Sequence, residues 1–148
     1  MKKIIIPILL FVSCSSTCKK NPFVERVYSI KVANDADYAC ITFESRIYPD
    51  TALPANVPYY STAFPEDYAV IDSKTEWSNV YKKFPADTLS IFILNSDTVK
   101  VNEWGIIRSG YKILKRYDLS LEDLKKLNWT ITYPAPEAMR NIKQYPPY

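Results

Sequence analysis

The sequence predicts a mainly β domain, an antiparallel β-sandwich for which an immunoglobulin-like arrangement is one form, with two or three short peripheral helices. Three observations predict it. Short runs alternate between apolar and polar side chains, turns rich in asparagine, aspartate or proline separate these runs, and the helical stripes are too short to form a layer of their own. We expect one folded domain at residues 23–134.

The first residues have the layout of a bacterial export signal. Two lysines precede an apolar run at residues 4–12, and Ser13 and Cys14 follow it. The run is shorter than the roughly 20 residues that a transmembrane helix needs, whereas its positive, apolar and small-residue parts fit a secretory signal. We therefore predict a signal peptide at residues 1–13.

Cys14 is the candidate lipidation site. Residues 11–14 (FVSC) loosely meet the lipoprotein pattern, with phenylalanine where leucine is usual. The alternatives are acylation of Cys18, which no apolar residue closely precedes, and secretion without a lipid. Each buried acyl CH₂ contributes about 0.8 kcal/mol, so several chains on one cysteine would anchor the protein stably to a membrane. Residues 14–22 are then a polar tether.

The first two predicted strands flank an Asx-rich turn. Residues 27–32 and 38–48 are β-rich runs on either side of residues 34–37 (NDAD), which predicts a hairpin. Cys40 lies in the second run, where it fits a buried structural thiol; a disulfide with Cys18 is the alternative. Zinc is disfavoured, because two thiols without CxxC spacing or histidine cannot supply four ligands.

A long loop is predicted at residues 49–65, which contain four prolines and no hydrophobic period. Tyr59 and Tyr60 lie in this loop. They are candidate ligand-stacking residues, because flat aromatic faces can stack on sugar rings. A short strand is expected at residues 68–71.

A short amphipathic helix is predicted next. Trp77 and the residues three, four and seven positions after it are aromatic or aliphatic, and Pro85 closes the segment. Residues 89–94 are apolar on both faces, which is typical of a central strand. A second short helix at residues 102–108 and a strand at residues 111–117 follow.

The last helix has the clearest local signal. Ser120 and Asp123 have the spacing of a capping box, which predicts a helix at residues 121–127. Asn128 can take the left-handed conformation at its end. Residues 129–133 alternate as a last strand, and residues 135–148 are predicted to be a proline-rich C-terminal tail. Each of the three tryptophans falls where the period predicts a core face.

Composition excludes several function classes. The chain has no histidine, the residue most used for acid–base chemistry near pH 7 and for metal ligation. Its two glycines form no phosphate-binding loop, and without Lys2 and Lys3 its 19 basic side chains fall to 17 against 16 acidic ones. We expect no enzyme, no catalytic residue, no metal, no cofactor and no nucleic-acid partner. The adjacent acidic pairs 66–67 and 122–123 are poorly placed for a glycosidase.

Residues 113–134 (ILKRYDLSLEDLKKLNWTITYP) resemble the C-terminal signature of small uncharacterised lipoproteins of Bacteroidales-type bacteria. The resemblance implies a β-rich domain in the cell envelope, lipid-anchored to the bacterial outer membrane and facing either the periplasm or the surface. It supplies no catalytic or ligand residue. It also implies O-glycosylation at Asp-Thr followed by a small or aliphatic residue, and Thr51 is the best candidate because it lies in the long loop.

Two functions are consistent with the sequence. The first is a lipid-anchored, non-catalytic interaction or accessory module with an unknown protein partner. The alternative is a carbohydrate-binding surface lipoprotein.

Overall fold

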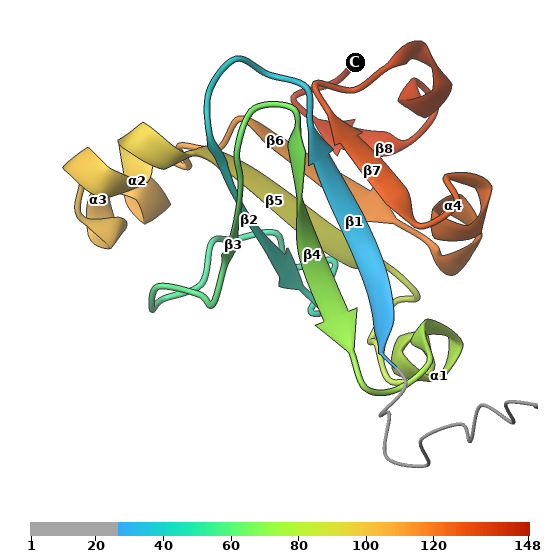
Figure 1. The fold of residues 1–148 in the computed structure, drawn as a ribbon. Helices are drawn as coiled ribbons and strands as arrows, with labels where there is room; N and C mark the ends of the chain where they lie inside the picture. The colour runs from blue at the N-terminus through green and yellow to red at the C-terminus, as the bar shows by residue number, and fades with distance from the viewer. Residues whose placement is uncertain (1–26) are drawn as a thin grey trace, which may run out of the picture.

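The computed structural model describes residues 27–148, which form two β-sheets with four short α-helices around them (Figure 1). The predictions for the signal peptide, for acylation of Cys14 or Cys18 and for the tether up to residue 22 lie outside the described residues. Within the described part, no helix is long and apolar enough to span a bilayer.

One sheet has three strands. In spatial order these are β4 (Asp67–Ser73), β1 (Tyr28–Asn34) and β7 (Thr130–Tyr133). β1 is antiparallel to β4 but parallel to β7, so this pair departs from the antiparallel pairing predicted from the sequence. The first residue of β7, Thr130, lies opposite Lys31 of β1, and the last, Tyr133, lies opposite Asn34.

The other sheet has five antiparallel strands. In spatial order these are β3 (Ser61–Ala63), β2 (Cys40–Ser45), β5 (Leu89–Asn95), β6 (Lys115–Leu119) and β8 (Lys143–Tyr145). β5 lies in the middle and its first six residues are buried, which confirms the central strand predicted at residues 89–94.

The predicted hairpin between the first two strands is wrong. β1 and β2 belong to different sheets, and residues 35–39 cross between them. The Asn34 side chain supports this crossover, because its amide Nδ2 donates hydrogen bonds to the carbonyl oxygens of Tyr38 at 2.8 Å and Ala63 at 3.2 Å. Both edges of β1 are already paired, with β4 and β7, so β2 finds its partners elsewhere.

The structure has four α-helices, where the sequence predicted two or three. They are α1 (Trp77–Tyr81), α2 (Ser96–Val101), α3 (Trp104–Ser109) and α4 (Leu121–Lys126), with a 3-10 turn η1 (Glu137–Met139). α2 was not predicted. It begins directly at the end of β5, where the Asn95 side chain accepts hydrogen bonds from the backbone N–H groups of Asp97 and Thr98.

The capping box of α4 is confirmed. The Ser120 hydroxyl accepts from the Asp123 N–H at 3.1 Å, and the Asp123 carboxylate accepts from the Ser120 N–H at 3.0 Å. Asn128 has the predicted left-handed conformation, with φ of 49°. The strand expected at residues 111–117 is β6, which begins only at Lys115.

The C-terminal residues 135–148, predicted to be a proline-rich tail beyond the folded domain, pack against that domain. They contain η1 and β8, and β8 pairs with residues 116–118 of β6. Met139 is 1% exposed and belongs to the core. The edge of β6 needs backbone partners, and this last segment supplies them.

Two apolar clusters stabilise the fold. The larger contains residues of both sheets, among them Ile30, Ile71 and Ile91. The smaller joins the opposite face of β5 to α3, through Phe92 and Ile107. Of the tryptophans predicted to be core residues, Trp77 is fully buried, and the other two pack partly buried against these clusters.

Candidate functional site

A hollow of about 490 Å³ opens between the edges of the two sheets. Its lining comes from β2 and β3 on one side, from β4 on the other, and from the loop before β3. The lining residues are Thr42, Phe43, Glu44, Pro58, Tyr59, Ser61, Val70, Ile71 and Asp72. This hollow is the candidate binding site.

The free edge of β4 forms one wall of the hollow. β4 is the outer strand of its sheet, and the Ser61 hydroxyl donates to the Val70 carbonyl at 3.1 Å. Lys31 of β1 lies opposite Val70 and donates its N–H to the Trp129 carbonyl oxygen at 2.8 Å, on the side of β1 away from β4. Since the N–H and C=O of one residue in an antiparallel strand point the same way, Val70 and Asp72 turn both groups away from β1 and toward the hollow.

Two side-chain oxygens in the lining have no hydrogen-bond partner within residues 27–148. They are the Thr42 Oγ1 and the Glu44 Oε2, and both are enclosed. The Glu44 Oε1 accepts from Arg46 Nε at 2.9 Å, so the carboxylate has a cation beside it. A buried polar atom without a hydrogen-bond partner lowers the stability of a fold by about 1–3 kcal/mol. No hydrogen bond within residues 27–148 offsets this cost for the two oxygens.

The Asp72 side chain lies on the solvent face of the three-stranded sheet, opposite to the face that carries Ile71. Its Oδ1 accepts from the Ser29 hydroxyl of β1 at 2.6 Å. The hollow is thus lined by the side-chain acceptors of Thr42 and Glu44, together with the backbone N–H groups of the β4 edge. Such a lining suits a ligand that carries hydroxyl groups.

The two predicted stacking residues separate in the structure. Tyr59 lines the hollow and its side chain is 96% exposed, whereas Tyr60 is 41% exposed and is not among the lining residues. The sequence did not single out Thr42, Glu44 or Asp72. The signal available was the alternation of Thr42 and Glu44 with Phe43, but a polar strand position is usually interpreted as facing solvent.

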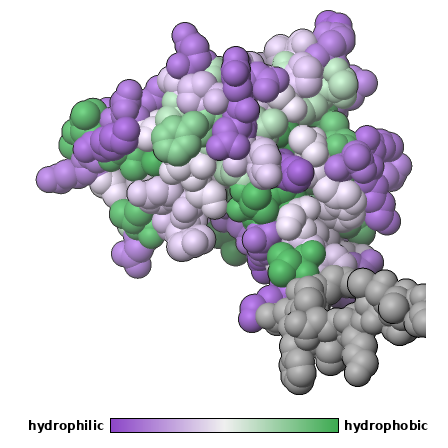
Figure 2. Space-filling model, in the orientation of Figure 1, coloured by the Kyte–Doolittle hydropathy of each residue, from purple (hydrophilic) through white to green (hydrophobic). Residues whose placement is uncertain are grey.

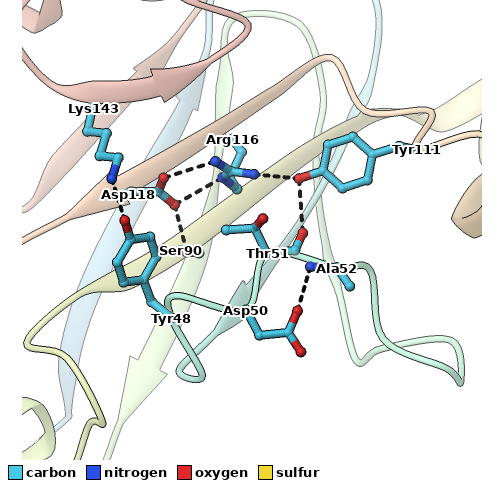
Figure 3. A network of polar contacts seen from close by, with 9 residues as sticks. All are labelled: Tyr48, Asp50, Thr51, Ala52, Ser90, Tyr111, Arg116, Asp118 and Lys143. Carbon is cyan, nitrogen blue, oxygen red and sulfur yellow. Dashed lines mark hydrogen bonds and ion pairs between the residues drawn. The ribbon is translucent and has the colours of Figure 1, made fainter.

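A second polar cluster lies on the five-stranded sheet (Figure 3). The Asp118 carboxylate, 3% exposed, accepts from the Ser90 hydroxyl at 2.7 Å and from Arg116 Nε and Nη2 at 3.0 and 3.1 Å. Burial disfavours the charged form of Arg116, but its hydrogen bonds to Asp118 and Tyr111 outweigh this and raise the pKa of the guanidinium. These groups have partners within the fold, so we interpret the cluster as structural.

This cluster also holds the long loop, in which Thr51 lies. Arg116 donates to the Tyr111 hydroxyl at 2.6 Å, and Tyr111 donates to the Thr51 carbonyl at 3.0 Å (Figure 3). Trp104 Nε1 and Arg108 Nε donate to further loop carbonyls, those of residues 54 and 53, at 2.9 and 3.0 Å. Thr51 itself is half-buried.

Cys40 and the predicted acidic pairs have structural surroundings. Cys40 is a free, buried thiol whose Sγ donates to Asn34 Oδ1 at 3.4 Å, and burial raises its pKa to about 11. It is therefore protonated and a poor nucleophile at neutral pH. Glu122 pairs with Lys126 at 3.0 Å, and Asp123 belongs to the capping box. Among residues 27–148 no group of three histidine, cysteine or acidic residues could hold a metal ion.

The chain matches no family model, no curated protein and no solved structure.

Proposed function

We propose that this chain is a lipid-anchored protein of the bacterial cell envelope, held at the outer membrane through Cys14, and that it acts as a non-catalytic interaction or accessory module. The export-signal layout that ends at Cys14 carries the proposal. The absence of histidine from the sequence and the protonated state of Cys40 support a non-catalytic role. The two sheets share one core, which supports a β-sandwich, with the immunoglobulin-like arrangement as one form.

Lipid anchoring predicts a loss of label on one substitution. Cys14→Ala, expressed in the native host, should take up no radiolabelled palmitate and should leave the membrane fraction, because the acylated thiol is gone. Cys18→Ala is the matched control and should keep both the label and the membrane location. If Cys14→Ala is labelled and sediments with membranes as the unsubstituted protein does, anchoring at Cys14 is wrong.

Carbohydrate binding by a surface lipoprotein is the second candidate function. The observation that favours it is the exposed ring of Tyr59 beside a hollow lined with hydroxyl-binding groups. Small-ligand sites have volumes of about 300–1,000 Å³, and the hollow falls in this range. The hollow thus has two candidate ligands, a protein partner and a glycan, and a binding experiment distinguishes them.

Thr51 is proposed as an O-glycosylation site within this envelope function. The loop position supports it, and the preceding Asp50 turns the chain there by accepting the Ala52 N–H at 3.0 Å. We expect the intact mass of protein purified from its host to exceed the sequence mass by a glycan, and Thr51→Val to remove the excess. Thr62→Val, on exposed β3, should leave the mass excess in place. An unmodified peptide at residues 49–53 would rule the site out.

A further inference from the structure

We propose that the hollow between β3 and β4 binds one ring of a neutral carbohydrate, with Tyr59 as the stacking platform and with Thr42 and Glu44 as the hydroxyl-binding groups. This inference rests on the second candidate function and assigns its site and ligand class. Figure 2 shows the face that carries β3 and β4, on which hydrophobic residues form separate groups between hydrophilic ones. A mixed surface of this kind favours a small polar ligand over a broad apolar interface.

The free ring of Tyr59 is the first step of the argument. Four other tyrosines of the described chain have a cation over the ring, at 4.7 to 5.8 Å from its centroid. They are Tyr48, Tyr68, Tyr145 and Tyr148. Tyr59 has no such contact within residues 27–148, and its side chain is 96% exposed. A sugar ring that enters the hollow can therefore stack on Tyr59 without displacing another side chain.

The unpartnered oxygens are the second step. Thr42 is 1% exposed, and its Oγ1, like the Glu44 Oε2, has no partner in the fold. Ligand hydroxyls could donate to both oxygens and relieve the penalty of leaving them unpaired. The two atoms are enclosed in the free protein, so this contact requires the Glu44 side chain, which is 23% exposed, to turn toward the hollow.

The backbone edge of β4 complements these acceptors. The N–H groups of Val70 and Asp72 face the hollow and can donate to the ring or hydroxyl oxygens of a sugar. Each sugar hydroxyl both donates and accepts. A lining with a carboxylate, a hydroxyl and strand N–H groups therefore matches a sugar better than it matches a ligand that only donates or only accepts.

The charge of the lining sets the ligand class. Glu44 places a carboxylate at the hollow, and this charge repels an acidic sugar. The cation of Arg46 already lies beside Glu44, which reduces the attraction for a positively charged ligand. A neutral ring therefore fits the hollow best.

The test is a titration of the detergent-solubilised full chain with matched sugars. The probes are glucose, galactose and mannose, each compared with its uronic acid, together with the corresponding neutral disaccharides, and saturation-transfer NMR is the readout. We expect at least one neutral sugar to bind, and its uronic acid to bind at least about tenfold more weakly, which corresponds to 1.4 kcal/mol. Equal binding of the acid, or no binding by any neutral sugar, would overturn the proposal.

Three variants locate the binding site. Tyr59→Ala should weaken binding of the neutral sugar about two- to tenfold, because stacking on an aromatic ring contributes about 0.5–1.5 kcal/mol. Thr42→Val should weaken binding while it leaves the melting temperature unchanged or raised, since it removes an unpaired buried hydroxyl. Tyr68→Ala, on the exposed side of β4, is the matched control and should bind as the unsubstituted chain does. Binding that survives both Tyr59→Ala and Thr42→Val would place the sugar elsewhere and contradict the proposal.

These outcomes separate this inference from the anchoring proposal. A chain that loses its palmitate label on Cys14→Ala but binds no neutral sugar keeps its role as an anchored interaction module and loses the sugar site. A chain that binds sugar through Tyr59 but takes up no label keeps the site and loses the anchor.

Discussion

Asp118→Ala is expected to lower the free energy of unfolding by about 3–5 kcal/mol, because it leaves one charge of a buried ion pair without its partner. The Asp118 side chain is fully buried and that of Arg116 is 13% exposed, so water cannot replace the lost carboxylate well. The Ser90 hydroxyl, which is also buried, loses its acceptor. The same substitution should loosen the long loop, since Arg116 holds Tyr111 against the Thr51 carbonyl.

Urea denaturation followed by tryptophan fluorescence measures this change. Asp97→Ala is the matched control, because its ion pair with Lys100 is 3.2 Å long but 67% and 78% exposed at the two side chains. An exposed pair of this kind contributes about 0–1 kcal/mol. A loss below about 1 kcal/mol for Asp118→Ala would show that the cluster does not stabilise the fold.

Ile91→Ala is expected to cost about 2–5 kcal/mol, since it removes a fully buried side chain from the middle of the molecule. Ile91 lies on β5 and packs in the cluster that contains residues of both sheets. It pairs with Tyr117 on one side and Glu44 on the other. The cavity would therefore open between the sheets, where neighbouring strands cannot close it without changing their register.

The check is again the free energy of unfolding, with Ile47→Ala as a control of the same residue type. Ile47 is 55% exposed, so its truncation should change stability by no more than about 0.5 kcal/mol. If the two variants lose similar stability, the placement of β5 at the centre of the core is wrong.

Local signals explain which elements could be predicted from the sequence. The capping box of Ser120 and Asp123 depends on residues three positions apart, and the strand at residues 89–94 shows its burial in its own composition. Both predictions are confirmed. α2 was missed because its cap, Asn95, is also the last residue of β5, so the strand pattern continues up to the first turn of the helix.

Long-range pairing explains the main errors. The turn after Asn34 has the composition of a hairpin, but the partners of β1 are β4 and β7, of which β7 lies roughly a hundred residues away along the chain. The C-terminal residues were predicted to be a proline-rich tail, yet residues 143–145 pair with β6. No local pattern in the sequence records these partners.

The residues of the candidate site likewise fall into those that the sequence alone indicates and those that only the fold reveals. Tyr59 could be found from the sequence, because an aromatic residue in a proline-rich loop is conspicuous on its own. Thr42 and Glu44 could not, since their side chains reach the hollow only because a second sheet lies opposite β2. Tyr60 has the same local sequence context as Tyr59, and only the fold distinguishes the two.

The long loop is fastened through main-chain oxygens, those of Thr51, Leu53 and Pro54. Every amino acid carries such an oxygen, so the path of this segment depends little on its side chains, apart from Asp50 at its turn and the buried Leu53. Residues 55–57 and 59 are exposed and can be exchanged while the backbone keeps its course. Exposed side chains at the rim of the hollow can thus change while the backbone stays in place. New binding preferences can therefore be selected without any change in the core.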